Sequence, residues 1–351
     1  MLWPVKIVLG LLRVASEAIL FFEAQRLVSH FVKPTSLAHV ARAEDRLLAA
    51  GVKSSVRHIW VKCGSWKLHT IVAGEDENGS KNEGERKAMV LLHGHSMSGA
   101  FYYRNLDDMV GLGYVVYAVD LLGWGRSDRP KFEAKVNSML EWYLNALERW
   151  RISIGLSQFA LIGHSLGAYL AYSYSVRFQN RISKLMLICP AAVSKKITLL
   201  RAFYFKVSPH TVVRRGGLLG WLMFSSQYPT SEMYVRDCLR FYCYQLAALP
   251  ASGDLSVSPM IRFRKWNTAE IRRPLIDNLG PVDIPIHIVC GETDTSVDVK
   301  DFHTLYEVMR KRGYNVRLDV IEGTDHCPHL ENPEAFGLVL NKFDKSKVPV
   351  R

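Results

Sequence analysis

Six apolar runs, spaced along the chain from residue 88 onward, constrain the fold of this 351-residue protein more than any other feature. Each run is rich in β-branched or aliphatic residues and ends at Gly, Pro or a polar residue: AMVLLHG, YVVYAVDLLG, FALIGHS, KLMLICP, IPIHIVCG and VRLDVIEG. Continuous apolar strands are typical of a parallel sheet that is covered on both faces. Helix-length segments separate most of the runs, for example residues 136–154 and 299–312. The alternation predicts an α/β fold with a mostly parallel central sheet flanked by helices.

Two segments fall outside this alternation. Residues 56–64 and 67–74, VRHIWVKCG and KLHTIVAG, are typical of two short strands in a hairpin-like pair. Between residues 191 and 281 no run resembles a buried strand, and the segment is aromatic, basic and helical in pattern. We therefore expect a helical cap of residues 191–281, inserted between two parts of one core, residues 51–190 and 282–345.

Residues 1–50 form a separate region in this scheme, an amino-terminal helical segment. Its first part is apolar, but charged residues interrupt it, and the longest uncharged stretch, residues 7–12, is far too short for a bilayer span of about 20 residues. The pattern fits an amphipathic helix at a membrane surface, and it fits a helix packed on its own domain equally well. A second helical pattern over residues 34–51 closes at Gly51.

Composition narrows the partners that the chain can bind. The 45 Lys and Arg residues outnumber the 33 Asp and Glu residues, and the net charge of +12 favours an anionic partner such as a lipid surface. We expect no nucleic-acid partner, because the sequence holds no recognisable motif for reading nucleic acid. The six cysteines form no CxxC pair, and no His/Cys cluster has zinc spacing, so we predict no metal centre and no cofactor. A reducing, intracellular compartment fits this use of cysteine.

The stretch FALIGHSLGAYLAY places Ser165 between Gly163 and Gly167, with an apolar strand before it and a helical pattern after it. This is the context in which GxSxG forms a nucleophile elbow. The sharp turn forces the serine into a strained backbone conformation, so the two glycines must lack side chains that would collide. The helix that follows points its free N–H groups at the reacting centre, and we expect the N–H of Leu166 to be one oxyanion donor.

A serine hydroxyl needs a base to take its proton, and the base needs a carboxylate to hold it. Two loops that follow strands supply these groups in chain order. Asp294 comes just after the strand that ends at Gly291, and His326 lies in the loop beyond the strand that ends at Gly323. Ligands bind at the carboxyl ends of strands in open α/β sheets. We predict that Ser165 is the nucleophile, that His326 is the base and that Asp294 orients the base.

Other residues compete for these roles. Asp298 is a second candidate acid, but it lies further into the next element. His329 is a second candidate base, although its Pro-His-Leu context is typical of packing. Asp325 is rejected because adjacent residues on an extended loop point apart. The other oxyanion donor is predicted to be the N–H of His95, in the loop HGHSMSG, where Gly94 allows a tight turn.

The stretch VDLLGWGRSDRP, residues 119–130, contains Asp120, Gly125 and Arg126. It is typical of a strand end followed by a turn. We expect this turn to pack under the site with a structural role.

Together these motifs resemble the α/β-hydrolase superfamily over residues 88–340. The stretches PTSLAHVARAEDRLL, DLLGWGRSDRP, LIGHSLGAYLAYSYSVRF and ENPEAF are similar to the subgroup of α/β-hydrolase domain proteins 4 and 5, which are lipid enzymes and a lipase coactivator. The resemblance implies hydrolysis of acyl esters or amides in phospholipids or lysophospholipids, or acyl transfer to lysophosphatidic acid. The coactivator branch lacks the serine that stands here at 165. The subgroup's acyltransferase signature is a His followed five residues later by Asp, whereas His326 is followed at that distance by Glu331.

The inserted segment also points toward lipid. Its Phe, Tyr, Trp and Leu residues can line an acyl channel, and its arginines can meet anionic headgroups. We expect a serine lipase or esterase whose substrate is a lipid ester, located inside the cell at the periphery of a membrane or lipid droplet, with the endoplasmic reticulum and the mitochondrion as candidates. Two alternatives stay open: a lysophosphatidic acid acyltransferase, and a non-catalytic adaptor that regulates another lipase.

Overall fold

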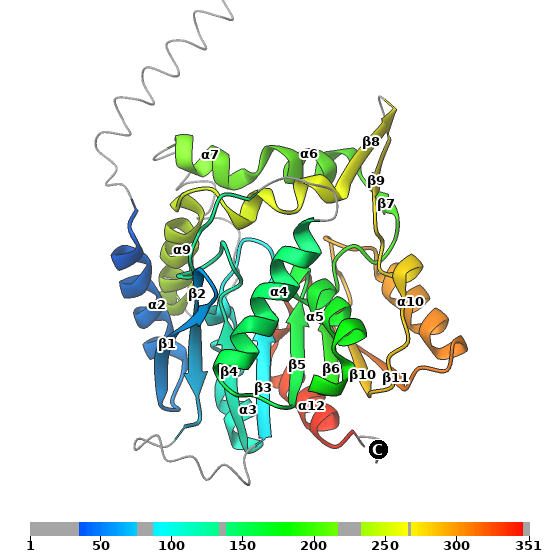
Figure 1. Cartoon of the computed structure of the whole chain (residues 1–351), viewed down its shortest axis with the longest axis horizontal. Helices are drawn as coiled ribbons and strands as arrows, with labels where there is room; N and C mark the ends of the chain where they lie inside the picture. The colour runs from blue at the N-terminus through cyan, green and yellow to red at the C-terminus, as the bar shows by residue number, and fades with distance from the viewer. Residues whose placement is uncertain (1–34, 76–86, 133–137, 217–232, 266–267, 347–351) are drawn as a thin grey trace, which may run out of the picture.

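The computed structural model describes residues 35–75, 87–132, 138–216, 233–265 and 268–346, and Figure 1 shows their arrangement. The predicted amino-terminal helix of residues 1–34 lies outside these ranges. Among the described residues, no helix combines the length and the apolar character that a membrane crossing requires.

An eight-stranded sheet in the order β1-β2-β4-β3-β5-β6-β10-β11 forms the centre of the molecule. Its strands are β1 (Val56–Cys63), β2 (Trp66–Ala73), β3 (Lys87–Leu92), β4 (Tyr114–Val119), β5 (Phe159–His164), β6 (Ile182–Ile188), β10 (Ile286–Gly291) and β11 (Val316–Ile321). The pairs β1–β2 and β2–β4 are antiparallel, and the other neighbours are parallel. The six apolar runs therefore form the six parallel strands, as predicted, and the hairpin-like pair forms β1 and β2.

Helices pack on both faces of this sheet because its central strands are apolar on both sides. Every residue of β5 and β10 is buried. In Figure 1, α4 (Ser138–Ser153) and α5 (Leu166–Arg177) lie in front of the sheet, and α12 (Pro333–Asp344) lies behind it. The remaining core helices are α3 (Leu106–Gly111), α10 (Val299–Lys311), α11 (Pro328–Glu331) and the short 3₁₀ turns η1 (Gly99–Tyr102) and η2 (Gln179–Arg181).

The insert lies over the carboxyl ends of the parallel strands, at the top of Figure 1. Its helices are α6 (Leu199–Val207), α7 (Pro209–Gly216) and α9 (Met233–Ala248), and its 3₁₀ turns are η3 (Gly253–Leu255), η4 (Ser258–Met260) and η5 (Ile276–Asn278). The helix α2 (Leu37–Gly51) was predicted from its pattern, and it packs against α9. This part of the amino-terminal region therefore packs on the protein itself.

One part of the insert differs from the prediction of a purely helical cap. A small sheet of order β7-β9-β8 joins β7 (Lys196–Ile197), β8 (Ile261–Lys265) and β9 (Thr268–Ile271). Ala269 and Ile271 are buried while Glu270 between them is not, a period of two that suits a strand and not a helix. The helical interpretation of this short segment was wrong because its aromatic and basic residues hide that alternation.

Candidate functional site

Ser165 stands at the turn between β5 and α5, where the backbone is strained. Its φ of 51° and ψ of −114° are rare for a residue with a side chain. A Cβ atom on Gly163 would lie 2.3 Å from the carbonyl oxygen of Gly167, and a Cβ atom on Gly167 would lie 2.2 Å from that of Leu92. Both positions therefore require glycine, and the sharp turn expected from GxSxG is present.

The three predicted site residues contact one another in sequence. His326 Nε2 lies 3.0 Å from Ser165 Oγ, and His326 Nδ1 lies 2.8 Å from Asp294 Oδ2. Asp294 follows β10 and His326 follows β11, so the carboxyl ends of three parallel strands bring the side chains together. In this arrangement Nδ1–H donates to the carboxylate, which leaves Nε2 free to accept the serine proton.

The environment of Asp294 keeps its carboxyl group ionised. Burial alone would raise the pKa of Asp294, but the hydrogen bond and charge of His326 and the backbone N–H groups of Val297 and Ser296 outweigh it and lower the pKa. The two N–H groups donate to Oδ1 at 2.9 and 2.7 Å. Both oxygens of the carboxylate are thereby satisfied, and its orientation toward His326 is fixed.

The competing candidates contact other groups. Asp298 caps α10 by accepting the N–H of Lys300. Asp325 accepts the backbone N–H of Thr295 at 2.6 Å and its hydroxyl at 2.9 Å. His329 is fully buried, and its ring packs 4.8 Å from the ring of His164.

Two residues that sequence reasoning had not assigned to the site hold the loop of His326 in place. Glu331 Oε2 accepts the backbone N–H of Asp325 at 2.6 Å, and its Oε1 accepts that of Cys327 at 3.0 Å. His164 Nε2–H donates to the carbonyl oxygen of His326 at 2.8 Å. The only signals in the sequence were the position of His164 inside GxSxG and of Glu331 five residues after the base.

The loop that contains His95 passes directly beside the serine. A Cβ atom on Gly94 would lie 3.2 Å from the Cβ of Ser165. The imidazole of His95 packs between the core turn and the cap: its ring centroid lies 4.9 Å from that of Trp124 in the turn and 5.4 Å from that of Phe205 in α6. Burial lowers the pKa of His95 to about 4, so the ring is neutral at neutral pH. The oxyanion roles of its N–H and of the N–H of Leu166, the first residue of α5, stay predictions.

The cap also contacts this loop through a hydrogen-bonded chain. Ser96, whose φ is 68°, lies with its Oγ 2.8 Å from His95 Nδ1 and 2.7 Å from Nε2 of His210 in α7. The position of the loop beside the serine therefore depends on the docking of the cap.

A pocket of about 1450 Å³ opens beside Ser165 and His326. This is larger than the roughly 300–1,000 Å³ of most small-molecule sites. Its lining combines apolar residues from both core and cap with charged ones; the apolar group includes Val193, Ile197, Leu199, Phe205, Ile271 and Val297. The basic side chains in the lining are Lys195, Lys196, Arg201 and Lys300. Three acidic residues, Glu270, Asp298 and Asp301, also line the pocket.

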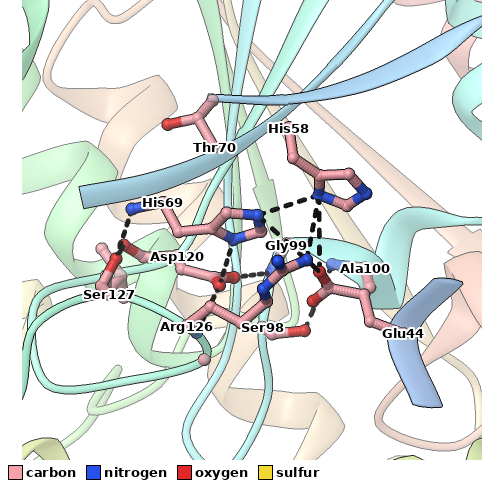
Figure 2. Close-up of polar contacts among 12 residues, drawn as sticks. Glu44, His58, His69, Thr70, Ser98, Gly99, Ala100, Asp120, Arg126 and Ser127 are labelled. Carbon is pink, nitrogen blue, oxygen red and sulfur yellow. Dashed lines mark hydrogen bonds and ion pairs between the residues drawn. The ribbon is translucent and has the colours of Figure 1, made fainter. Parts of the chain in front are cut away.

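Two groups of side chains in the described part of the chain bring metal-binding atoms together. One is Cys189 with Asp294 and His326, whose carboxylate and imidazole already bond to each other. The other is Glu44 with His58 and His69, drawn in Figure 2, which lies outside the pocket lining.

Comparison with known proteins places the chain in a family. The profile of the alpha/beta hydrolase family matches residues 89–337. Human 1-acylglycerol-3-phosphate O-acyltransferase ABHD5 is 26% identical over 323 residues, which cover 86% of this chain and 88% of that protein. Human (lyso)-N-acylphosphatidylethanolamine lipase is 24% identical over 88% of this chain and 92% of its own. The crystal structure of carboxylesterase CesB (YbfK) from Bacillus subtilis superposes with a TM-score of 0.65 at 18% identity, covering 88% of this chain and 97% of that one. The chain belongs to the α/β-hydrolase family and has its fold.

Proposed function

We propose that this protein is a serine hydrolase that cleaves acyl esters of lipids, with phospholipids or lysophospholipids as substrates. The observation that carries the proposal is the unbroken chain of contacts from Ser165 Oγ through His326 to Asp294, beside a large pocket that is mostly apolar. This order of groups activates a hydroxyl for attack on a carbonyl carbon.

Acylation begins when Ser165 Oγ attacks the carbonyl carbon of the ester and His326 Nε2 takes the hydroxyl proton. Asp294 keeps the proton on Nδ1 and stabilises the imidazolium that forms. The N–H groups of His95 and Leu166 donate hydrogen bonds to the carbonyl oxygen and stabilise the negative charge that develops on it. His326 then gives its proton to the leaving oxygen, and the acyl group stays on Ser165.

Deacylation repeats these steps with water as the attacking group. His326 removes a proton from the water, the hydroxide adds to the acyl carbon, and the serine oxygen leaves with the proton that His326 returns. The products are a fatty acid and the free enzyme. This chemistry uses no cofactor.

The pocket and the relatives support a lipid substrate. The apolar lining can take an acyl chain, while Lys196 and Lys300, two exposed lysines in the lining, can meet an anionic headgroup. The names of the two human relatives both describe glycerol phospholipids or their lyso forms. The pocket therefore favours an amphipathic ester with one charged end.

The outer face of the cap supports location at a membrane or lipid-droplet surface. Phe203 in α6 is 62% exposed and Phe263 in β8 is 41% exposed, and their ring centroids lie 6.2 Å apart. Arg262 and Arg264 flank Phe263, and both are exposed. Exposed aromatic rings beside arginines suit the boundary between headgroups and acyl chains.

The alternative in which an acyl acceptor replaces water draws on the name of the human acyltransferase relative. The contacts of Glu331 favour hydrolysis, because both of its oxygens accept backbone N–H groups of the His326 loop. A carboxylate used in this way does not face an incoming acceptor. A non-catalytic adaptor would have no use for the intact contacts of Ser165, His326 and Asp294.

A lipid panel tests the proposal directly. Wild-type protein, Ser165→Ala and a control variant are each incubated with phospholipids, lysophospholipids and neutral glycerides. The control is Ser173→Ala, at a partly buried serine on α5, the helix that follows Ser165. Ser165→Ala must lose fatty-acid release and fluorophosphonate labelling, and Ser173→Ala must keep both. Labelling that survives Ser165→Ala but disappears in Ser96→Ala would move the nucleophile to Ser96 and refute the assignment. Adding acyl-CoA and a lysophospholipid acceptor to the wild type separates transfer from hydrolysis.

A further inference from the structure

A buried cluster of titratable side chains lies where α2 meets the hairpin β1–β2, and Figure 2 shows it. Glu44 comes from α2, His58 from β1 and His69 from β2. Glu44 and His69 are fully buried, and the side chain of His58 is 22% exposed. Glu44 Oε1 lies 3.6 Å from His58 Nδ1 and 3.7 Å from His69 Nε2, and the two nitrogens lie 2.9 Å apart.

Two imidazole nitrogens of this cluster face each other at short range. His69 Nδ1 donates to Asp120 Oδ2 at 2.7 Å, which turns Nε2 of the same ring toward His58. Arg126 Nη1, which can only donate, lies 3.3 Å from His58 Nδ1. His58 Nδ1 and His69 Nε2 lie 2.9 Å apart, with Glu44 Oε1 beside both.

We propose that Glu44, His58 and His69 bind a divalent transition-metal ion, Zn²⁺ in the first place. The point equidistant from the three ligand atoms lies about 2.0 Å from each, which is the bond length of Zn²⁺ to imidazole nitrogen and carboxylate oxygen. Two imidazoles and one carboxylate are a donor set that zinc uses. Asp120 on His69 Nδ1 and Asp45 near His58 Nε2 are the outer carboxylates that orient metal-binding histidines.

Arg126 competes with the metal for the same carboxylate. Its Nη1 donates to Glu44 Oε1 at 2.9 Å, while its guanidinium lies 4.9 Å from the ring centroid of Trp60 and its Nη1 4.0 Å from Asp45 Oδ1. Metal binding displaces the guanidinium from Glu44 and leaves it over Trp60 and beside Asp45. The exchange replaces one cation by another, so the buried carboxylate stays neutralised in both forms.

The other oxygen of Glu44 accepts the hydroxyl of Tyr242 in α9. A metal ion here therefore joins α2, the β1–β2 hairpin and a helix of the cap. The site is structural, and it does not depend on the proposed hydrolysis at Ser165.

A zinc titration of the full chain tests the proposal. The protein is first stripped of metal with EDTA, and Zn²⁺ is then added in competition with a chromophoric chelator. The wild type is expected to bind about one Zn²⁺ per chain. His58→Ala and His69→Ala should weaken binding on the order of 100-fold, and Asp45→Asn about 10-fold. Arg126→Met should strengthen binding about 10-fold, because it removes the competing cation. His39→Ala, a partly buried histidine on α2 outside the cluster, serves as the matched control and should leave zinc binding unchanged.

Circular dichroism of each stripped variant shows whether it is folded. The Asp45→Asn change, at an exposed side chain, keeps the test usable if a histidine variant unfolds. Ser165→Ala should bind zinc like the wild type, which separates this result from the fate of the hydrolase proposal. The proposal is overturned if the wild type binds no zinc, or if the His58, His69 and Arg126 variants all bind as the wild type does. Loss of binding in Asp294→Asn with retention in His69→Ala would place the ion at the other ligand group and overturn it as well.

Discussion

The carboxylate of Glu331 offers the sharpest test of how the site is held. It accepts two backbone N–H groups, from Asp325 at 2.6 Å and Cys327 at 3.0 Å, and these residues flank His326. Glu331→Gln keeps one acceptor and turns an amide NH₂ group toward the second N–H. An unpaired N–H that had bonded to a charged group costs about 2 kcal/mol. If this energy is needed to hold the His326 loop in its catalytic position, kcat drops about 30-fold, while KM stays within about twofold.

The assay is ester hydrolysis with the concentration of competent enzyme fixed by fluorophosphonate titration, so that unfolded protein does not count as a slow enzyme. Glu334→Gln is the matched control, because this glutamate is exposed on the first turn of α12. It should leave kcat unchanged. A folded Glu331→Gln variant with the kcat of the wild type would show that these two bonds do not position His326.

Three further changes have direct readouts. Gly163→Ala places a Cβ atom 2.3 Å from a backbone carbonyl oxygen. Thermal unfolding should show that the protein loses about 3 kcal/mol of stability, and fluorophosphonate labelling should fail. Wild-type stability would mean that the turn relaxes. Phe203→Glu combined with Phe263→Glu should weaken sedimentation with phosphatidylserine vesicles about 10-fold, and unchanged binding would remove this face from the membrane proposal. Burial alone would raise the pKa of Asp254, but Arg214, the backbone N–H of Ser252 and the charge of His210 outweigh it and lower the pKa to about 2, so the ionised form stabilises the fold. By urea unfolding, Asp254→Asn should be about 2 kcal/mol less stable than the wild type above about pH 4, and this difference should shrink as pH falls toward 2. A difference in stability that does not change with pH would contradict this.

The strands and the three contacting side chains were predictable because they follow from local patterns with a known geometric consequence. An apolar run that ends in glycine becomes a buried strand, and parallel strands place their carboxyl ends at one edge. The residues that follow β5, β10 and β11 therefore meet, and the contacts of Ser165, Asp294 and His326 are present. Their catalytic role, like the oxyanion role of His95, stays a proposal.

The supporting residues were not predictable because their partners are backbone groups or distant side chains. Glu331 bonds to two N–H groups, a use that leaves no trace in residue type. His210 reaches Ser96 from a cap helix more than a hundred residues away. The hairpin of β8 and β9 is short, and its basic and aromatic residues gave no clear period.

The cluster of Glu44, His58 and His69 shows the limit of spacing as a guide to metal sites. Zinc motifs are recognised from ligands a few residues apart on one turn, and the sequence contains none. Here the ligands come from three elements, and the sheet register sets two of them: His58 pairs with Ile71 and Trp60 with His69, so the two imidazoles lie diagonally across one antiparallel pair. Asp120, at the end of β4, then bonds both to His69 and to the backbone N–H groups of Gly99 and Arg126. The turn that was expected to be structural is therefore the element that orients one of the proposed ligands, and only the folded chain shows it.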